Sequence, residues 1–504
     1  IGISLAIIGI LFLAIVTLNL SKNEEIIIFC FMYGFMVFMV FNLFKISKAG
    51  DVDITNTINT LNKLQEDLER KTFIQDMLNH ANMEFEINEK MAYDDCADGY
   101  YYRGDFYIKF EKFYSAIKDF EKVIQLDKNY KEAYRGKGVC YSRLGDNDLA
   151  IKNYEKALQI DPNYEVAYYN LGVSYSNLKE YDKAMESYKK ALELDENDVS
   201  AYYNRGRILA YLGRYKEALK DFTNAINLEK YDERLLYERA GIFYLMKRYK
   251  DALLDYKAFV NLAPHMKEGY LGMADCYCQM NQMNNAIEYY NKSIEIDPNY
   301  EESYFNRSVA YLKQDDLRKA IKDLDKVIGL NPKNGEAYYN RALAYGRMEN
   351  HTKVIRDFSK AIKMGYKVGK SYCNRGKEYS LTGNFKKAKD DYTRSIEHGY
   401  DSYIVYMGRG AANLDLEEYN EAILDFNKAI ELDNTKLGNY YYRGLAYYNL
   451  KQYKEAIDDF SVAIEGCPSD IRAYEKRGDA YCRIGDYDNA IKDFFMISRL
   501  EQKS

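Results

Sequence analysis

The chain opens with two uncharged, apolar stretches, residues 1–20 and 26–44, which a short polar segment separates. At about 1.5 Å per residue, a twenty-residue helix spans about 30 Å, the thickness of the hydrocarbon core of a bilayer. A soluble helix pair would show a polar face, and a signal peptide would be shorter and would lack the second stretch. We therefore expect two transmembrane helices, 1–20 and 26–44, that form a hairpin.

Basic residues beside these stretches predict the side of the membrane on which the rest of the chain lies. Lys45 and Lys48 follow the second stretch, whereas the loop between the stretches carries only Lys22. Because lysine and arginine are enriched on the cytoplasmic side, this bias places the remaining residues in the cytoplasm. The chain begins at Ile1 rather than at a methionine, and an odd number of further spans upstream would reverse this topology.

Residues 51–96 are mostly polar, with apolar side chains three and four residues apart between Ile54 and Leu68. This spacing predicts an amphipathic juxtamembrane helix. Two heptads are few for a coiled coil, so the linker is either a dimerisation helix or a spacer that packs on the following residues.

From Ala97 onward the pattern of apolar and polar residues repeats every 34 residues, without insertion or deletion, and twelve repeats end at Ser504. We write each repeat as one row of an alignment and number its positions from 1 to 34. The predicted repeats start at residues 97, 131, 165, 199, 233, 267, 301, 335, 369, 403, 437 and 471. Position 8 of each row is small, whereas positions 4 and 24 are large, which predicts two helices with interlocking surfaces. All five prolines fall at position 32, just past the second helix, where the missing N–H interrupts no helical hydrogen bond.

In its period and in these positions, the chain resembles the tetratricopeptide repeat family over 408 of its 504 residues. The resemblance implies an all-α fold, an α–α superhelix of twelve 34-residue helix-turn-helix repeats, preceded here by the transmembrane hairpin. The sequence departs from the family pattern at position 4, where tyrosine replaces tryptophan, and at position 7, where arginine replaces leucine.

The arginine at position 7 calls for a partner, because a charge in a half-buried helix interface is costly unless it is paired. Nine rows have this arginine, and the same nine have aspartate at position 23. The pairs are Arg103 with Asp119, Arg205 with Asp221, Arg239 with Asp255, Arg307 with Asp323, Arg341 with Asp357, Arg375 with Asp391, Arg409 with Asp425, Arg443 with Asp459 and Arg477 with Asp493. Both positions are equally far from the turn at position 15, so we predict an ion pair across each hairpin.

The resemblance implies that the first helices of the repeats line a concave groove in which peptides lie. Positions 5 and 6 of these helices repeatedly hold an aromatic residue and an asparagine. The candidates are Tyr169 and Asn170, Tyr203 and Asn204, Phe305 and Asn306, Tyr339 and Asn340, and Asn374 after a cysteine. Asparagine amides can bind a peptide backbone and aromatic rings can cover its side chains, but asparagine at this position can also be purely structural.

Position 9 faces the same groove and varies between rows, with Arg207 and Lys377 among its residues. Variation on a constant frame is typical of a specific binding groove, although solvent exposure alone would also produce it. Some members of the family hold chaperone C-termini with a lysine at position 5. No row has that lysine, so this class of partner is not expected.

The last row is apolar where most rows are polar, with Phe495 and Met496 at positions 25 and 26. A terminal repeat normally turns a polar face outward. Either a partner or a second copy covers these residues by self-association, or the native chain continues past Ser504.

Composition narrows the function further. Basic and acidic residues nearly cancel, 71 against 77, which argues against nucleic acid as a partner. The eight cysteines show no C-x-x-C spacing, the four histidines form no metal-binding motif, and no nucleotide-binding or nucleophile motif is present, so we expect no metal, no cofactor and no enzyme.

The sequence therefore predicts a membrane-tethered scaffold that binds proteins or extended peptides in the groove. A regulator or receptor that responds to a peptide, and a factor in envelope or secretion assembly, are the alternatives.

Overall fold

A computed structural model describes residues 96–501. The predicted transmembrane hairpin, and all of the predicted linker except Cys96, lie outside these residues. The described part of the chain contains α-helices and turns and no strand. Its longest helix has fifteen residues, and none of its helices combines the length and apolarity needed to cross a bilayer.

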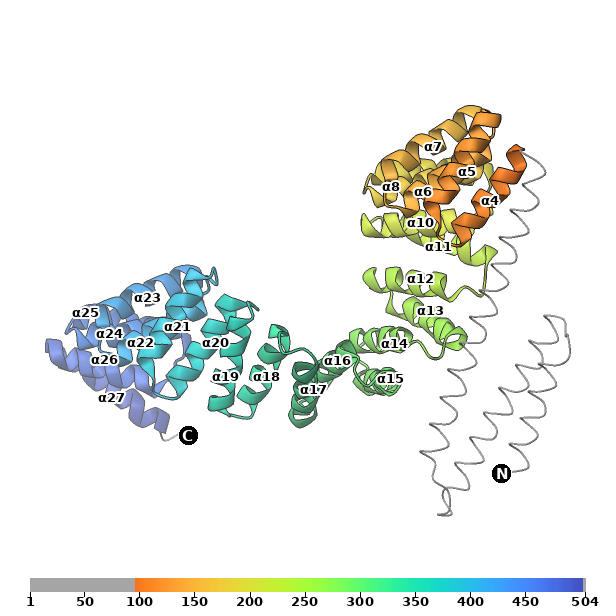
Figure 1. The fold of residues 1–504 in the computed structure, drawn as a ribbon. Helices are drawn as coiled ribbons and strands as arrows, with labels where there is room; N and C mark the ends of the chain where they lie inside the picture. The colour runs from red at the N-terminus through yellow and green to blue at the C-terminus, as the bar shows by residue number, and fades with distance from the viewer. Residues whose placement is uncertain (1–95, 502–504) are drawn as a thin grey trace, which may run out of the picture. The chain divides into compact units, whose positions relative to one another are not determined.

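The predicted all-α array of hairpins is confirmed for the described residues, where twenty-four helices, α4 to α27, follow one another in pairs (Figure 1). The described residues divide into two compact units, with the boundary between Tyr164 and Glu165. The first unit contains α4 (Ala97–Lys109), α5 (Phe113–Leu126), α6 (Lys131–Arg143) and α7 (Asn147–Ile160).

The second unit contains the remaining ten hairpins. Their first helices are α8 (Glu165–Asn177), α10 (Val199–Tyr211), α12 (Glu233–Leu245), α14 (Lys267–Gln279), α16 (Glu301–Lys313), α18 (Gly335–Arg347), α20 (Val368–Leu381), α22 (Tyr403–Asp415), α24 (Gly438–Asn449) and α26 (Ile471–Ile484). Their second helices are α9 (Tyr181–Leu194), α11 (Tyr215–Leu228), α13 (Tyr249–Leu262), α15 (Met283–Ile296), α17 (Leu317–Leu330), α19 (His351–Lys363), α21 (Phe385–Glu397), α23 (Tyr419–Leu432), α25 (Tyr453–Gly466) and α27 (Tyr487–Glu501).

Each hairpin turns at position 15, where the backbone is left-handed with φ between 55° and 88°. These residues are Glu111, Gly145, Lys179, Gly213, Lys247, Asn281, Asp315, Glu349, Gly383, Glu417, Lys451 and Gly485. A single left-handed residue ends an α-helix and lets its last carbonyls find N–H donors in the turn. In the second hairpin, for example, the N–H of Asp146 donates to the carbonyl of Tyr141.

The two helices of a hairpin meet where small residues face aromatic rings. A Cβ atom on Gly138 would lie 2.5 Å from the ring of Tyr154, and one on Gly172 would lie 2.7 Å from the ring of Tyr188. Both distances are shorter than van der Waals contact, so the small residue at position 8 fits the ring at position 24. This packing places the first helix of each hairpin at a fixed distance from the second.

All nine predicted ion pairs are confirmed, with nitrogen-to-oxygen distances of 2.6 to 2.7 Å. The aspartates are buried, and Asp357 is 0% exposed. In Arg341, Nε and Nη2 donate to the two carboxylate oxygens of Asp357, which is the bidentate geometry that makes such bonds strong.

The remaining nitrogen of the arginine, Nη1, links most hairpins of the second unit to the one before. In seven rows it donates to a side-chain oxygen at position 25 of the preceding repeat, over 2.5 to 3.4 Å. The acceptors are Thr223, Asn291, Asp325, Ser359, Thr393, Asn427 and Ser461. We call these arginines and their acceptors the arginine ladder.

At two interfaces between successive repeats of the second unit, the hydrogen bond of the arginine ladder is absent. Lys189 occupies position 25 before Arg205, and Lys257 occupies it before Met273. A lysine ammonium cannot accept a hydrogen bond, so neither site can form the link. In the first unit, Lys137 replaces the arginine and donates instead to Glu121 at the same spacing, over 2.8 Å.

Replacing Asp357 with alanine should destabilise the array strongly, because it leaves the buried Arg341 without its main partner. Breaking such a pair costs about 3 kcal/mol or more. Native-state hydrogen exchange of α18 and α19 measures the loss. The control is Glu217→Ala, whose partner Arg214 lies on the surface, and it should leave exchange unchanged. Equal effects of the two variants would contradict the proposed role of the buried pair.

Replacing Asn439 with alanine should stabilise the chain. Asn439 is 0% exposed, and its amide nitrogen and oxygen have no hydrogen-bond partner in the described part of the chain. Five of the eleven other repeats have alanine at this position, so the smaller side chain fits, and removing an unsatisfied buried amide stabilises by about 1 kcal/mol. The thermal unfolding midpoint should rise, whereas Asn427→Ala, which removes an acceptor of Arg443, should not raise it.

Candidate functional site

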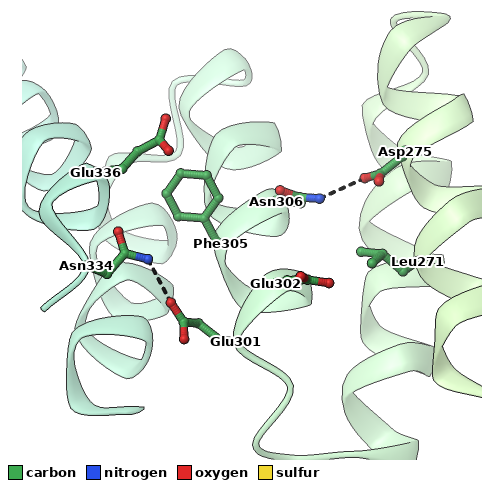
Figure 2. Close-up of a pocket in the computed structure, with 8 residues that line it drawn as sticks. All are labelled: Leu271, Asp275, Glu301, Glu302, Phe305, Asn306, Asn334 and Glu336. Atoms are coloured by element: carbon green, nitrogen blue, oxygen red, sulfur yellow. Dashed lines mark hydrogen bonds between the residues drawn. The ribbon is translucent and has the colours of Figure 1, made fainter. Parts of the chain in front are cut away.

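Positions 1, 2, 5, 6 and 9 of the first helices form a common face, because residues three and four apart lie on the same side of a helix. In the second unit, these positions of α14, α16 and α18 line a cavity of about 340 Å³ (Figure 2). Its lining residues are Leu271, Asp275, Glu301, Glu302, Phe305, Asn306, Asn334 and Glu336. We call this side of the first helices the groove face.

Three of the predicted aromatic residues belong mainly to the interior of their hairpins. The rings of Tyr169, Tyr203 and Tyr339 lie against the rings at position 24, with centroids 5.5 to 6.3 Å apart. Tyr339 is only 4% exposed. Phe305 differs, because position 24 of its row holds the smaller Leu324, and its ring lines the cavity.

Three of the predicted asparagines link successive repeats. Asn204 donates from Nδ2 to the hydroxyl of Tyr169, over 3.1 Å, and Asn374 donates in the same way to Tyr339, over 3.2 Å. Asn306 donates to Asp275 over 3.0 Å. Each of these bonds uses one N–H of an amide that offers two donors and two acceptor lone pairs. These asparagines therefore have a structural role and still present hydrogen-bonding groups.

The other predicted residues differ in accessibility. Asn170 and Asn340 are half-buried, whereas Arg207 and Lys377 are exposed. The guanidinium of Arg207 lies 5.6 Å from the centre of the Tyr203 ring and 3.6 Å from a carboxylate oxygen of Glu238. The two basic side chains are accessible on the groove face at opposite sides of the cavity repeats.

Four carboxyl groups of the cavity were not predicted as site residues. Tyr290 donates to Asp275 over 2.6 Å, Asn334 to Glu301 over 2.7 Å, Tyr300 to Glu302 over 2.8 Å and Tyr366 to Glu336 over 2.6 Å. All of these donors are neutral, and none of the four acids is in an ion pair with another described residue. A signal exists in the sequence, since three consecutive rows have glutamate at position 2, namely Glu268, Glu302 and Glu336.

Large apolar side chains are exposed at four further positions of the groove face. Tyr237, Leu343, Ile404 and Tyr442 are between 36% and 41% exposed. The sequence does not distinguish them from core residues, because both kinds occur on the same short helices. They give the groove face apolar contact area in addition to its polar groups.

A second cavity, of about 460 Å³, lies beside Met273, where the arginine ladder lacks a rung. Tyr270, Tyr289 and Lys257 are among its lining residues. At the last repeat, Phe495 is 68% exposed, whereas Met496 packs against Ile464, Ala473 and Tyr474. Within residues 96–501, no three His, Cys, Asp or Glu side chains lie close enough together to hold a metal ion.

Comparison with known proteins identifies the repeat. Models described as tetratricopeptide repeat match residues 97–130, 166–198, 199–232, 301–334, 335–364 and 373–436, and a further model described as TPR repeat matches 141–179, 274–315 and 444–485. Together these matches cover more than half of the chain. A search of curated proteins gave no match.

Among solved structures, the chain is similar to the C-terminal part of a TPR repeat-containing protein from Cytophaga hutchinsonii. That alignment has 22% identity and a TM-score of 0.43, and it covers 48% of this chain and 98% of the other. YrrB, described as a TPR protein with an unusual peptide-binding site, is 26% identical with a TM-score of 0.34, over 36% of this chain and 95% of its own. A chain of the APC/C hetero-tetramer Cut9–Hcn1 is 16% identical with a TM-score of 0.35, and the alignment covers 85% of this chain and 92% of that one.

Replacing Asp275 with asparagine should change how stability depends on pH. Burial raises the pKa of Asp275 to about 6, although hydrogen bonds from Tyr290 and Asn306 oppose the shift. The folded state therefore favours the protonated acid, and wild-type stability should fall as pH rises from about 4 to about 6. An asparagine cannot ionise, so the variant should be more stable than the wild type above pH 6, by about 3 kcal/mol, and should lose this advantage near pH 4.

Thermal unfolding at pH 4.5 and 7.5 measures this difference. Glu295→Gln, an exposed change on the second helix of the same repeat, is the control and should show no such dependence. An advantage of Asp275→Asn that is equal at both pH values would contradict the assignment to this carboxyl group.

Proposed function

We propose that this chain, which belongs to the tetratricopeptide repeat family, is a non-enzymatic scaffold that binds an extended segment of a partner protein along its groove face. The observation that carries the proposal is the groove face of residues 165–504. Successive first helices present exposed apolar side chains there, together with amide groups and a cavity.

An extended segment is the occupant that these groups suit best. An extended chain has unpaired backbone N–H and C=O groups that need partners, and its side chains point alternately to opposite sides. Asn204, Asn306 and Asn374 retain donors and acceptors for such a backbone. Tyr237, Leu343 and Ile404 provide apolar contacts for the side chains that point toward the protein.

The proposal includes a membrane tether formed by residues 1–20 and 26–44, with the repeats in the cytoplasm. Its support is the absence of charge in these two stretches and the lysines that follow them. It also includes self-association or partner contact at Phe495, whose exposed ring is the kind of surface that proteins usually cover.

Photo-crosslinking tests whether partners occupy the groove face. A crosslinking amino acid at position 237, 343 or 404 of the full chain in its native cells should yield specific crosslinked products, because these side chains point into the proposed path of the partner. Leu254 and Leu424, 65% and 68% exposed on second helices, are the matched controls. They should yield at least tenfold less product, and comparable or greater yields from the controls would contradict the proposed binding surface.

A further inference from the structure

The cavity between α14, α16 and α18 has the shape and charge of a receptor for one kind of side chain. Figure 2 shows the ring of Phe305 between Glu336 on one side and Glu302 on the other, with Leu271 across the cavity on α14. Apolar groups thus line its interior, and carboxyl groups surround them. Long side chains with an apolar stem and a polar head fit such a site, because each part finds matching contacts.

The negative charge of the cavity favours a side chain whose polar end is a cation. Asp275, Glu301, Glu302 and Glu336 contribute four carboxyl groups, and no lysine or arginine is among the lining residues. Their hydrogen-bond donors are tyrosine hydroxyls and asparagine amides, which orient the carboxyl groups without neutralising them. Asp275, Glu301 and Glu336 are half-buried and Glu302 is exposed. Half-buried carboxylates without an ion-pair partner are costly, so a cation that enters the cavity gains electrostatic energy.

Two lysines of the repeats that form or follow the cavity, Lys267 and Lys367, have other partners. Lys267 is paired with Asp297. The ammonium of Lys367 lies 5.4 Å from the centre of the Tyr339 ring and 4.9 Å from that of Tyr366. The pKa of Lys267 is raised mainly by its hydrogen bond to Asp297 and that of Lys367 mainly by Tyr366, while Glu302 and Glu336 add smaller attractions. Neither lysine forms an ion pair with an acid of the cavity in the described part of the chain, so the four carboxyl groups can still accept a cation from outside.

We infer that this cavity binds a lysine or arginine side chain of the partner segment, so that the partner carries a basic residue at this point of the groove face. This inference rests on the proposed function. The ring of Phe305 offers this basic side chain a cation–π contact, in addition to the attraction of the carboxylates. A metal ion suits the site less well, because no three of these acids lie close enough together to coordinate one ion.

Neighbouring repeats fix where the basic residue must lie. Lys370 and Lys377, at positions 2 and 9 of α20, are exposed on the groove face one repeat beyond Glu336. A basic residue that shifted by one repeat in this direction would meet like charges, which disfavour the wrong register. The acidic cavity and the basic repeat beside it therefore specify both the residue and its position.

Peptide selection on the full chain tests the inference. A library of random linear peptides displayed on phage is selected against the purified chain in detergent micelles, and bound peptides are sequenced and synthesised. We expect a shared lysine or arginine. Replacing an arginine of this kind with citrulline, which keeps the shape and removes the charge, should weaken binding to the wild type by at least tenfold.

Variants of the chain assign the effect to the cavity. Glu302→Gln and Glu336→Gln keep an oxygen that can accept from Tyr300 and Tyr366, so they should preserve the fold, which thermal unfolding checks. On the double variant, the arginine and citrulline peptides should bind with affinities within about threefold of each other. The control is Glu295→Gln, an exposed change on α15, the second helix of the repeat that contains Asp275. It should retain the full tenfold difference in affinity between the arginine and citrulline peptides.

The outcomes separate the two proposals. Selected peptides without a preferred basic residue, or an arginine-to-citrulline effect that persists on the double variant, would overturn the inference while leaving the scaffold function intact. The scaffold function itself would fail if no peptide were selected, or if all selected peptides bound equally well after Tyr237→Ala, Leu343→Ala and Ile404→Ala were combined.

Discussion

The buried ion pair between position 7 and position 23 is the interaction on which the arrangement of the hairpins depends. A guanidinium has a fixed planar fork, so the arginine that satisfies its own aspartate has one nitrogen left, and that nitrogen points toward the preceding repeat. Arg341, for example, binds Asp357 with two nitrogens and Asp325 with the third. The same side chain thus fixes the geometry within a hairpin and the stacking of one hairpin on the next.

This geometry positions the groove face. The small residue at position 8 and the ring at position 24 set the distance between the helices of a hairpin, and the arginine ladder sets the register between hairpins. Positions 2, 5, 6 and 9 of successive first helices therefore point to a common side. Groups as far apart in sequence as Leu271, Phe305 and Glu336 line one cavity as a result.

Periodicity explains how much of this could be predicted from the sequence. The ion pairs could be predicted because Arg and Asp recur together in the same nine rows, and their correlation implies contact. The hydrogen bond from the arginine to position 25 could not be predicted, because its acceptors differ chemically, from Asp325 to Thr393. Each acceptor also belongs to a different repeat from the arginine that it binds, so no correlation within one repeat indicates the contact. The asparagines were predicted as ligands from a repeated pattern, and three of the five, Asn204, Asn306 and Asn374, also bond to Tyr169, Asp275 and Tyr339 of the preceding repeat, which the pattern did not indicate.

The residues that give the candidate site its chemistry are departures from the repeat. Asp275 is one of several unrelated residues at its position, and Phe305 lines the cavity because its row has Leu324 rather than an aromatic ring. A periodic reading of the sequence gives such positions little weight. Positions that recur form the frame, and positions that differ determine what the frame can bind.

The hydrogen bonds that are absent from the arginine ladder have a consequence for how repeats can follow one another. Each ladder arginine contacts a residue sixteen positions earlier, so a hairpin is matched to its predecessor and not only to itself. The chain contains one such mismatch, where Lys189 precedes Arg205 and pairs with Glu193 of its own helix instead. A hairpin with a lysine at position 25 can therefore precede one with an arginine at position 7, but the two hairpins then lose the hydrogen bond that joins their neighbours.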